Sequence, residues 1–253
     1  MLGVLVAAMA GLVTGQALDL LWGRFYTGEE IRTPLYRCAD CRAPLRPIYA
    51  VPFAAGVLWE DGCCPDCGEP LPLRSILLPA GATILFIISY AAFGRSLGPA
   101  LLGGFFATVF FALTLTDLEA HLLPNRIVYP SILLAIALCW AWPDTSVLQI
   151  AAGGLVAILI AAGMLAFSQF FGPEAFGLGD VKMIVLMGFV AGMPSIIVGV
   201  FLGTIAGGVA AGLLILTHRR SRRDYIPHGP FLALGAVIAL FWGNAIWDAY
   251  TGG

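Results

Sequence analysis

The sequence predicts an all-α polytopic membrane protein with about eight transmembrane helices and one small polar module. Of its 253 residues, 60% are apolar and only 11% are charged, whereas soluble domains carry about 25% charged residues. The mean hydropathy is +0.92. The runs at 75–93 and 150–171 are apolar on every face, which suits a spanning helix and excludes a membrane barrel strand. The net charge of −2 and the lack of a basic stripe exclude a nucleic-acid partner.

The apolar runs place the helices in order along the chain, at about 20 residues per crossing. The first run, at 2–22, has no basic start and no small-residue cleavage site, so it is interpreted as a span and not as a signal peptide. The sixth and seventh spans are separated only by the residues at 192–194. The predicted spans are 2–22, 75–93, 98–116, 127–142, 148–171, 181–193, 195–217 and 230–250.

The basic residues predict the orientation of these spans. If the insert at 23–74 is cytoplasmic, twelve of the thirteen basic residues lie on that side and Arg95 alone lies on the other. Such a bias obeys the positive-inside rule and places both termini outside. The twelve are Arg24, Arg32, Arg37, Arg42, Arg46, Arg74, Arg126, Lys182, Arg219, Arg220, Arg222 and Arg223.

Two C-x-x-C pairs in the insert at 23–74 predict a metal-binding module. Cys38 and Cys41 form the first pair, and Cys64 and Cys67 form the second. Two such knuckles at this spacing suit a tetrahedral thiolate site for structural Zn²⁺. Disulfides or free thiols are the alternatives, but disulfides are rare in a reducing cytosol. A bound metal would supply folding energy that the small core of this module lacks.

Two carboxylates at the predicted cytoplasmic edge are candidates for chemistry. Asp117 follows an apolar run, and Asp180 precedes another one within the sequence Gly-Leu-Gly-Asp-Val-Lys. Spans three and six therefore bring the two aspartates to the same depth. Paired carboxylates suit amide hydrolysis, because one stays protonated while the other takes a proton from water. Gly177 and Gly179 leave room for a substrate backbone.

The alternatives for these residues are a proton or ion pathway and a metal site. Intramembrane acids also serve ion-coupled transporters, although such transporters usually contain inverted repeats and none is evident here. Asp117 and His121 are four residues apart, as metal ligands on one helix face often are. His218 and His228 lie far along the chain, so no complementary histidine cluster and no catalytic metal is expected.

Several separated segments together resemble the type IV prepilin peptidases, which are eight-span membrane aspartic peptidases also called prepilin leader peptidase/N-methyltransferases. The matching segments occur in the family's order. They are Gly-Gln-Ala-Leu-Asp19 with Arg24, the double C-x-x-C insert with Pro52, Asp117 with Leu-Leu-Pro124, Glu174 with Gly-Leu-Gly-Asp180-Val-Lys182, and Gly229-Pro-Phe-Leu-Ala-Leu-Gly235.

The resemblance implies an aspartic endopeptidase of the bacterial inner membrane with its active site facing the cytoplasm. Asp117 and Asp180 would be catalytic, and Gly177, Gly179, Lys182 and Glu174 would bind substrate. The substrate would be a type IV prepilin or a type II secretion pseudopilin, cut between its basic leader and its apolar helix. S-adenosylmethionine-dependent methylation of the new N-terminus often follows in this family. Residues 75–253 would form the peptidase domain, after a first helix at 1–22 and the zinc module at 23–74.

The chain departs from the family pattern mainly outside the aspartate pair. Gln16 and Asp19 replace the family's Ser and Asn, Pro79 stands where a Glu is usual, and Asn125 and His228 replace an Asp and an aromatic residue. These changes bear on methyl transfer more than on peptide cleavage. A zinc-bearing scaffold for a secretion machine remains a third hypothesis, which requires both aspartates to be dispensable.

Overall fold

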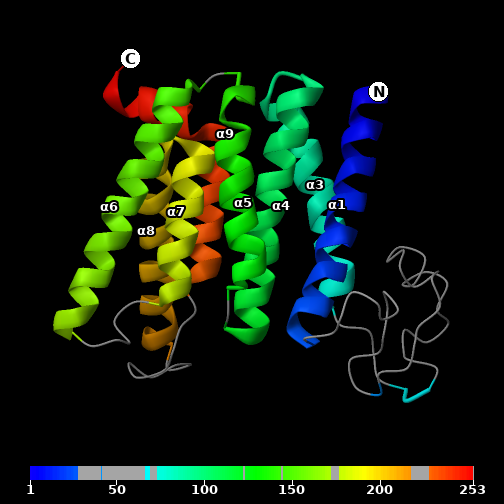
Figure 1. Ribbon diagram of the computed structural model, residues 1–253, viewed down its shortest axis with the longest axis horizontal. Coiled ribbons are helices and arrows are strands. Elements are labelled where there is room, and N and C mark those ends of the chain that lie inside the picture. The colour runs from blue at the N-terminus through cyan, green and yellow to red at the C-terminus, as the bar shows by residue number, and fades with distance from the viewer. Residues whose placement is uncertain are drawn as a thin grey trace.

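The computed structural model describes residues 1–27, 41, 66–68, 73–121, 123–143, 145–171, 177–217 and 228–252. Apart from short turns, this part of the chain is helical and forms one bundle of helices running up and down (Figure 1). The elements are α1 (Leu2–Thr27), α3 (Arg74–Ala92), α4 (Leu97–Ala120), α5 (Asn125–Ala137), the 3-10 helix η2 (Cys139–Ala141), α6 (Val147–Phe171), α7 (Leu178–Ala191), α8 (Ser195–Leu216) and α9 (Gly229–Thr251).

The helices confirm the polytopic membrane class. Six of those in the described ranges are long and apolar enough to cross a bilayer, namely α1, α3, α4, α6, α8 and α9. The other two, α5 with 13 residues and α7 with 14, are shorter than the roughly 20 residues of a full crossing. Each predicted span overlaps one of these eight α-helices, although α5 ends at Ala137, before the end of the span predicted at 127–142. Helices α7 and α8 are separated at Gly192–Pro194, where the sequence predicts a break.

Both chain ends lie at one end of the bundle (Figure 1). The opposite end carries the end of α1, the start of α3, the end of α4 and the starts of α5, α7 and α9 (Figure 1); we call it the carboxylate end because it contains Asp117 and Asp180. Among the described basic side chains, Arg74, Arg126 and Lys182 lie on its helix ends, whereas Arg95 lies in the turn between α3 and α4 at the other end. This distribution agrees with the asymmetry that the sequence predicts.

Close helix contacts at small residues hold the bundle together. Between α8 and α9, a side chain added at Gly235 would collide with the backbone oxygen of Gly199. Between α1 and α3, a Cβ at Gly15 would lie 2.6 Å from the Cα of Pro79. Because lipid is as apolar as the side chains, such close backbone approach and van der Waals packing drive helix association in a membrane. The largest core side chains, including Phe106 and Phe110, are fully buried in the bundle.

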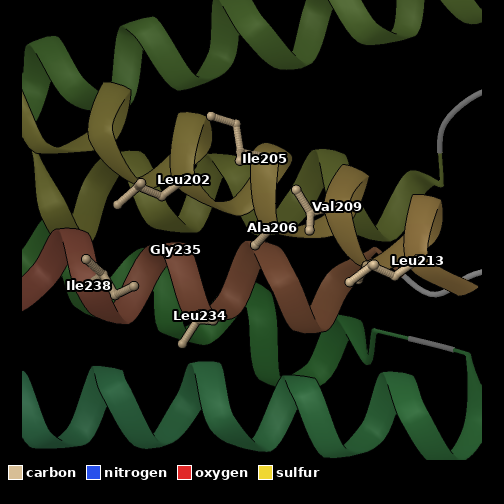
Figure 2. A pocket seen from close by; sticks show the side chains of 9 residues that line it. Leu202, Ile205, Ala206, Val209, Leu213, Leu234, Gly235 and Ile238 are labelled. Atoms are coloured by element: carbon tan, nitrogen blue, oxygen red, sulfur yellow. The ribbon is translucent and has the colours of Figure 1, made fainter.

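A shallow groove between α8 and α9 is lined only by apolar residues (Figure 2). On α9 it involves Leu234 and Ile238, which lie about half a turn around the helix from Gly229, the residue that faces Asp117. The groove therefore opens on a different face from the carboxylates. Its lining residues are Leu202, Ile205, Ala206, Val209, Ala210, Leu213, Leu234, Gly235 and Ile238.

Candidate active site at the carboxylate end

Asp117 lies in the last turn of α4 and is almost completely buried, with 5% of its surface exposed. The helix ends here because His121 adopts a left-handed conformation with φ 51°, and its backbone N–H donates to the Asp117 carbonyl oxygen at 2.9 Å. The Asp117 Oδ2 atom is buried and makes no hydrogen bond to any described residue. A buried oxygen without a partner is costly in a purely structural role, so this carboxylate is a functional candidate.

Asp180 lies in the first turn of α7 and is partly exposed. Gly177 precedes the helix in an extended conformation, and its carbonyl oxygen accepts the Asp180 N–H at 3.1 Å. A negative side chain is favoured in the first turn of a helix because the unpaired N–H groups there carry partial positive charge. The extended Gly177 thus precedes the first turn of α7, and Asp180 places a carboxylate in that turn.

The start of α9 lies against Asp117, between the helices that carry the two aspartates. Both α4 and α7 pack against α9, and the Gly229 backbone N–H lies close enough to the Asp117 carboxylate to favour its negative charge. A Cβ at Gly229 would lie 2.5 Å from Asp117 Oδ2, so only glycine permits this approach. The charges of Asp117 and Asp180 act on one another. The structure therefore brings together the two aspartates that the sequence singles out.

His228 also belongs to this site, directly before α9. Its ring packs over the bare backbone of Gly207, where a Cβ would lie 2.5 Å from the imidazole Nδ1. Burial lowers the pKa of the His228 imidazole, and the negative charge of Asp117 opposes this shift. His228 follows Asp117 by more than a hundred residues, but it lies near this carboxylate because α9 packs against α4. Within the described ranges, no three His, Cys, Asp or Glu residues form a metal-binding group.

Lys182 reaches across from α7 to α5. Its Nζ donates to the Asn125 Oδ1 at 2.7 Å and lies 5.9 Å from the centre of the Tyr129 ring. Lys182 is two residues after Asp180, so it leaves α7 on a different face from that carboxylate. It holds the start of α5 beside the start of α7.

The other predicted substrate-binding residues have different surroundings. Gly177 is exposed, and the nearest group to a Cβ there is the Asp180 carboxylate, with Oδ2 at 3.5 Å. At Gly179 the space is filled, because a Cβ would lie 2.6 Å from the Leu123 Cδ1. Gly179 therefore permits close packing of α7 against Leu123. Glu174 lies outside the described residues.

A second charged cluster joins three helices at the same end of the bundle. The Arg74 Nε donates to Asp19 Oδ1 at 2.7 Å, and its Nη1 donates to Glu119 Oε2 at 2.8 Å. The guanidinium also lies over the ring of Trp22, with Cζ 5.7 Å from the ring centre. In the sequence, Asp19 stands out as a replacement for the Asn that is usual in the family pattern, and the sequence does not indicate which cation neutralises it.

Only part of the predicted zinc module lies in the described ranges. Cys41 and Cys67 are exposed, and Cys38 and Cys64 lie outside the described residues. The thiolate site therefore stays a prediction from the spacing of the cysteines.

The fold and the site together define a class: a multi-pass α-helical membrane protein with a close pair of carboxylates at one end of its bundle. Two family models match this chain. The model of the type IV leader peptidase family covers residues 104–212, and the bacterial Peptidase A24 N-terminal domain covers residues 9–93. The chain belongs to the type IV leader peptidase family and is an enzyme of the peptidase class.

Similar curated proteins extend over most of the chain. Prepilin leader peptidase/N-methyltransferase of Bacillus subtilis (strain 168) is 29% identical, covering 91% of this chain and 94% of its own. The proteins of the same name from Burkholderia pseudomallei (strain 1026b) and Aeromonas hydrophila are 28% and 26% identical. They cover 96% and 86% of this chain, and 84% and 74% of their own. No solved structure matches the chain significantly.

Proposed function

We propose that this protein removes the short basic leader from type IV prepilins or type II secretion pseudopilins, using Asp117 and Asp180 to activate a water molecule. The proximity of these two carboxylates at the carboxylate end is the observation that carries the proposal. The prepilin substrate is supported by the names of the relatives from Bacillus, Burkholderia and Aeromonas.

The proposed reaction uses one carboxylate in each protonation state, because two like charges at short range do not both ionise readily. The ionised carboxylate takes a proton from water as the water oxygen attacks the carbonyl carbon of the scissile peptide bond. The protonated carboxylic acid donates its proton to the carbonyl oxygen. When the tetrahedral intermediate collapses, the C–N bond breaks and the amide nitrogen receives a proton from the first carboxyl group. The second carboxylate recovers its proton from the intermediate's hydroxyl group.

Neighbouring residues of the site have distinct proposed roles. The Gly229 N–H favours the negative charge of the Asp117 carboxylate, and the absence of a side chain at Gly229 allows Asp117 Oδ2 to lie close to the start of α9. The exposed Gly177 next to Asp180 offers space for the extended backbone of a substrate. Lys182 and Glu174 are proposed to contact the substrate, Lys182 after release from its hydrogen bond to Asn125.

The proposed orientation places the carboxylate end at the cytoplasmic face of the bacterial inner membrane. The described cations Arg74, Arg126 and Lys182 belong to helix ends on this side, as the positive-inside rule requires of a cytoplasmic face. A prepilin leader is also basic, so the same rule retains it in the cytoplasm. Its apolar helix lies in the membrane, and the bond between the two lies at the depth of the carboxylates.

Two further groups complete the proposal. Cys38, Cys41, Cys64 and Cys67 are proposed to hold a structural zinc ion, which stabilises a cytoplasmic module at 23–74 beside the peptidase domain at 75–253. S-adenosylmethionine is proposed to supply a methyl group to the newly exposed amine, as the N-methyltransferase part of the relatives' names suggests. Gln16, Asp19 and Pro79 are the family departures that bear on this second step.

A cleavage assay with purified protein in lipid vesicles tests the proposed function. Asp117→Asn and Asp180→Asn are each expected to abolish removal of the leader from a full-length prepilin. Both variants should still fold, as shown by a cooperative thermal unfolding transition. Asp248→Asn is the matched control, because Asp248 is an exposed acid at the other end of α9, and it should cleave at the wild-type rate. Cleavage at the wild-type rate by either active-site variant would contradict the proposal.

A further inference from the structure

Arg74 connects three helices at the carboxylate end through short, directional contacts. It starts α3, pairs with Asp19 of α1 at 2.7 Å and pairs with Glu119 of α4 at 2.8 Å. Asp19 is 4% exposed and Arg74 is 14% exposed, so both charges are largely removed from solvent. An arginine is suited to this role, because its planar fork donates to two acceptors in fixed directions.

The α4 partner of Arg74 lies two residues from the proposed catalytic carboxylate. Successive helix residues are about 100° apart, so Glu119 and Asp117 point to nearly opposite sides of the last turn of α4. Asp117 faces the start of α9, where Gly229 contacts it, and Glu119 faces Arg74. This last turn is therefore held from both sides, just before α4 ends at His121.

Asp19 and Trp22 hold the Arg74 guanidinium group in a fixed orientation for its contact with α4. Asp19 accepts from Nε and leaves Nη1 directed at Glu119, while the ring of Trp22 covers the guanidinium face as in other cation–π pairs. Both residues lie on α1, just before the insert at 23–74, and Arg74 is the last residue of that insert. The Arg74 side chain thus links α1 to the start of α3 and also contacts the helix that carries Asp117.

We propose that Arg74 is a positioning residue for peptide cleavage: by holding Glu119 it fixes the last turn of α4, and thereby the Asp117 carboxylate, relative to Asp180. This inference rests on the proposed catalytic role of Asp117. The ion-pair cluster of Arg74, Asp19 and Glu119 would then influence the peptidase reaction without contacting Asp117 or Asp180. Displacing a reacting group by about 1 Å can lower a rate by around a hundredfold, so a small shift of this turn is enough to affect the rate.

The test is a double-mutant cycle in kcat with the full-length protein in vesicles and a full-length prepilin. Its members are Glu119→Gln, Arg74→Gln and the double variant. Glu119→Gln is expected to lower kcat roughly tenfold, part of the loss that full misplacement would cause, with KM within about twofold of wild type. Because Glu119 is 40% exposed, its ion pair adds little to stability, so the unfolding temperature of Glu119→Gln should stay close to that of the wild type. The double variant should be no slower than Arg74→Gln alone.

Each contrary outcome overturns the inference. Wild-type kcat in Glu119→Gln would show that the contact does not position Asp117. Additive losses in the cycle would show that Arg74 and Glu119 act separately. A raised KM with unchanged kcat would make Glu119 a contact for the basic leader instead. A wild-type protein that does not cleave the prepilin, or an active Asp117→Asn variant, would refute the proposed function itself, so the two failures are distinguishable.

Discussion

Gly229→Ala perturbs the candidate active site without changing any charge. The added Cβ would lie 2.5 Å from Asp117 Oδ2 and 3.0 Å from its Cγ. Ordinary contacts between such atoms begin near 3.5 Å, so the Asp117 carboxylate must move by about 1 Å. A displacement of this size is expected to lower kcat by around a hundredfold, which corresponds to about 2.7 kcal/mol of transition-state stabilisation. The fold should survive, because the Asp117 side chain can rotate away from the added methyl group.

The assay compares kcat for prepilin cleavage with the unfolding temperature of the same purified variant. Gly208→Ala is the matched control, because Gly208 lies on α8 and a Cβ there meets no atom within 4 Å. That variant should cleave at the wild-type rate. If Gly229→Ala cleaves as fast as Gly208→Ala, the reasoning that places Asp117 against the start of α9 is refuted.

Three further predictions concern the charged residues and the cysteines. Asp19→Asn is expected to destabilise the protein by about 1–3 kcal/mol, because it removes one partner of the shielded Arg74; an unfolding temperature equal to that of wild type would contradict the contact. His228→Phe should flatten the pH dependence of stability below about pH 6.5, the ordinary pKa of histidine. The pKa of His228 is lowered in the folded chain, so the unfolded chain binds a proton first, and wild-type stability falls on acidification; parallel curves of unfolding temperature against pH would oppose this. Elemental analysis of the purified protein should find about one zinc per chain, as two C-x-x-C pairs hold one ion, and Cys41→Ser should lose it. Metal-free wild-type protein would eliminate the thiolate site.

The helices were predictable because composition and length alone identify a membrane span. The run at 148–171 contains no charged residue, and α6 occupies Val147–Phe171 almost without deviation. The short α7 was also predictable, since Gly192 and Pro194 interrupt an otherwise continuous apolar stretch. Where the helix ends are polar, prediction was less accurate: α1 continues to Thr27, five residues past the predicted span.

The aspartate pair was predictable because the orientation of the spans puts Asp117 and Asp180 at one membrane edge. The residues that surround this pair were not predictable from the sequence. His228 and Gly229 follow Asp117 by more than a hundred residues, and their position depends on how α9 packs against α4 and α8. The pairing of Arg74 with Asp19 was hidden for the same reason. Both acids and bases near a span are visible in a sequence, but their partners are set by helix packing.

The mass of a prepilin's N-terminal peptide, measured after co-expression with this protein, tests the central claim most directly. With the wild-type chain, the leader should be absent from the pilin, and the mass of the new N-terminus will also show whether a methyl group was added. With Asp117→Asn or Asp180→Asn at equal membrane abundance, the full-length leader should remain. A mature pilin N-terminus in cells that contain only an aspartate variant would contradict the assignment of Asp117 and Asp180 as the catalytic pair.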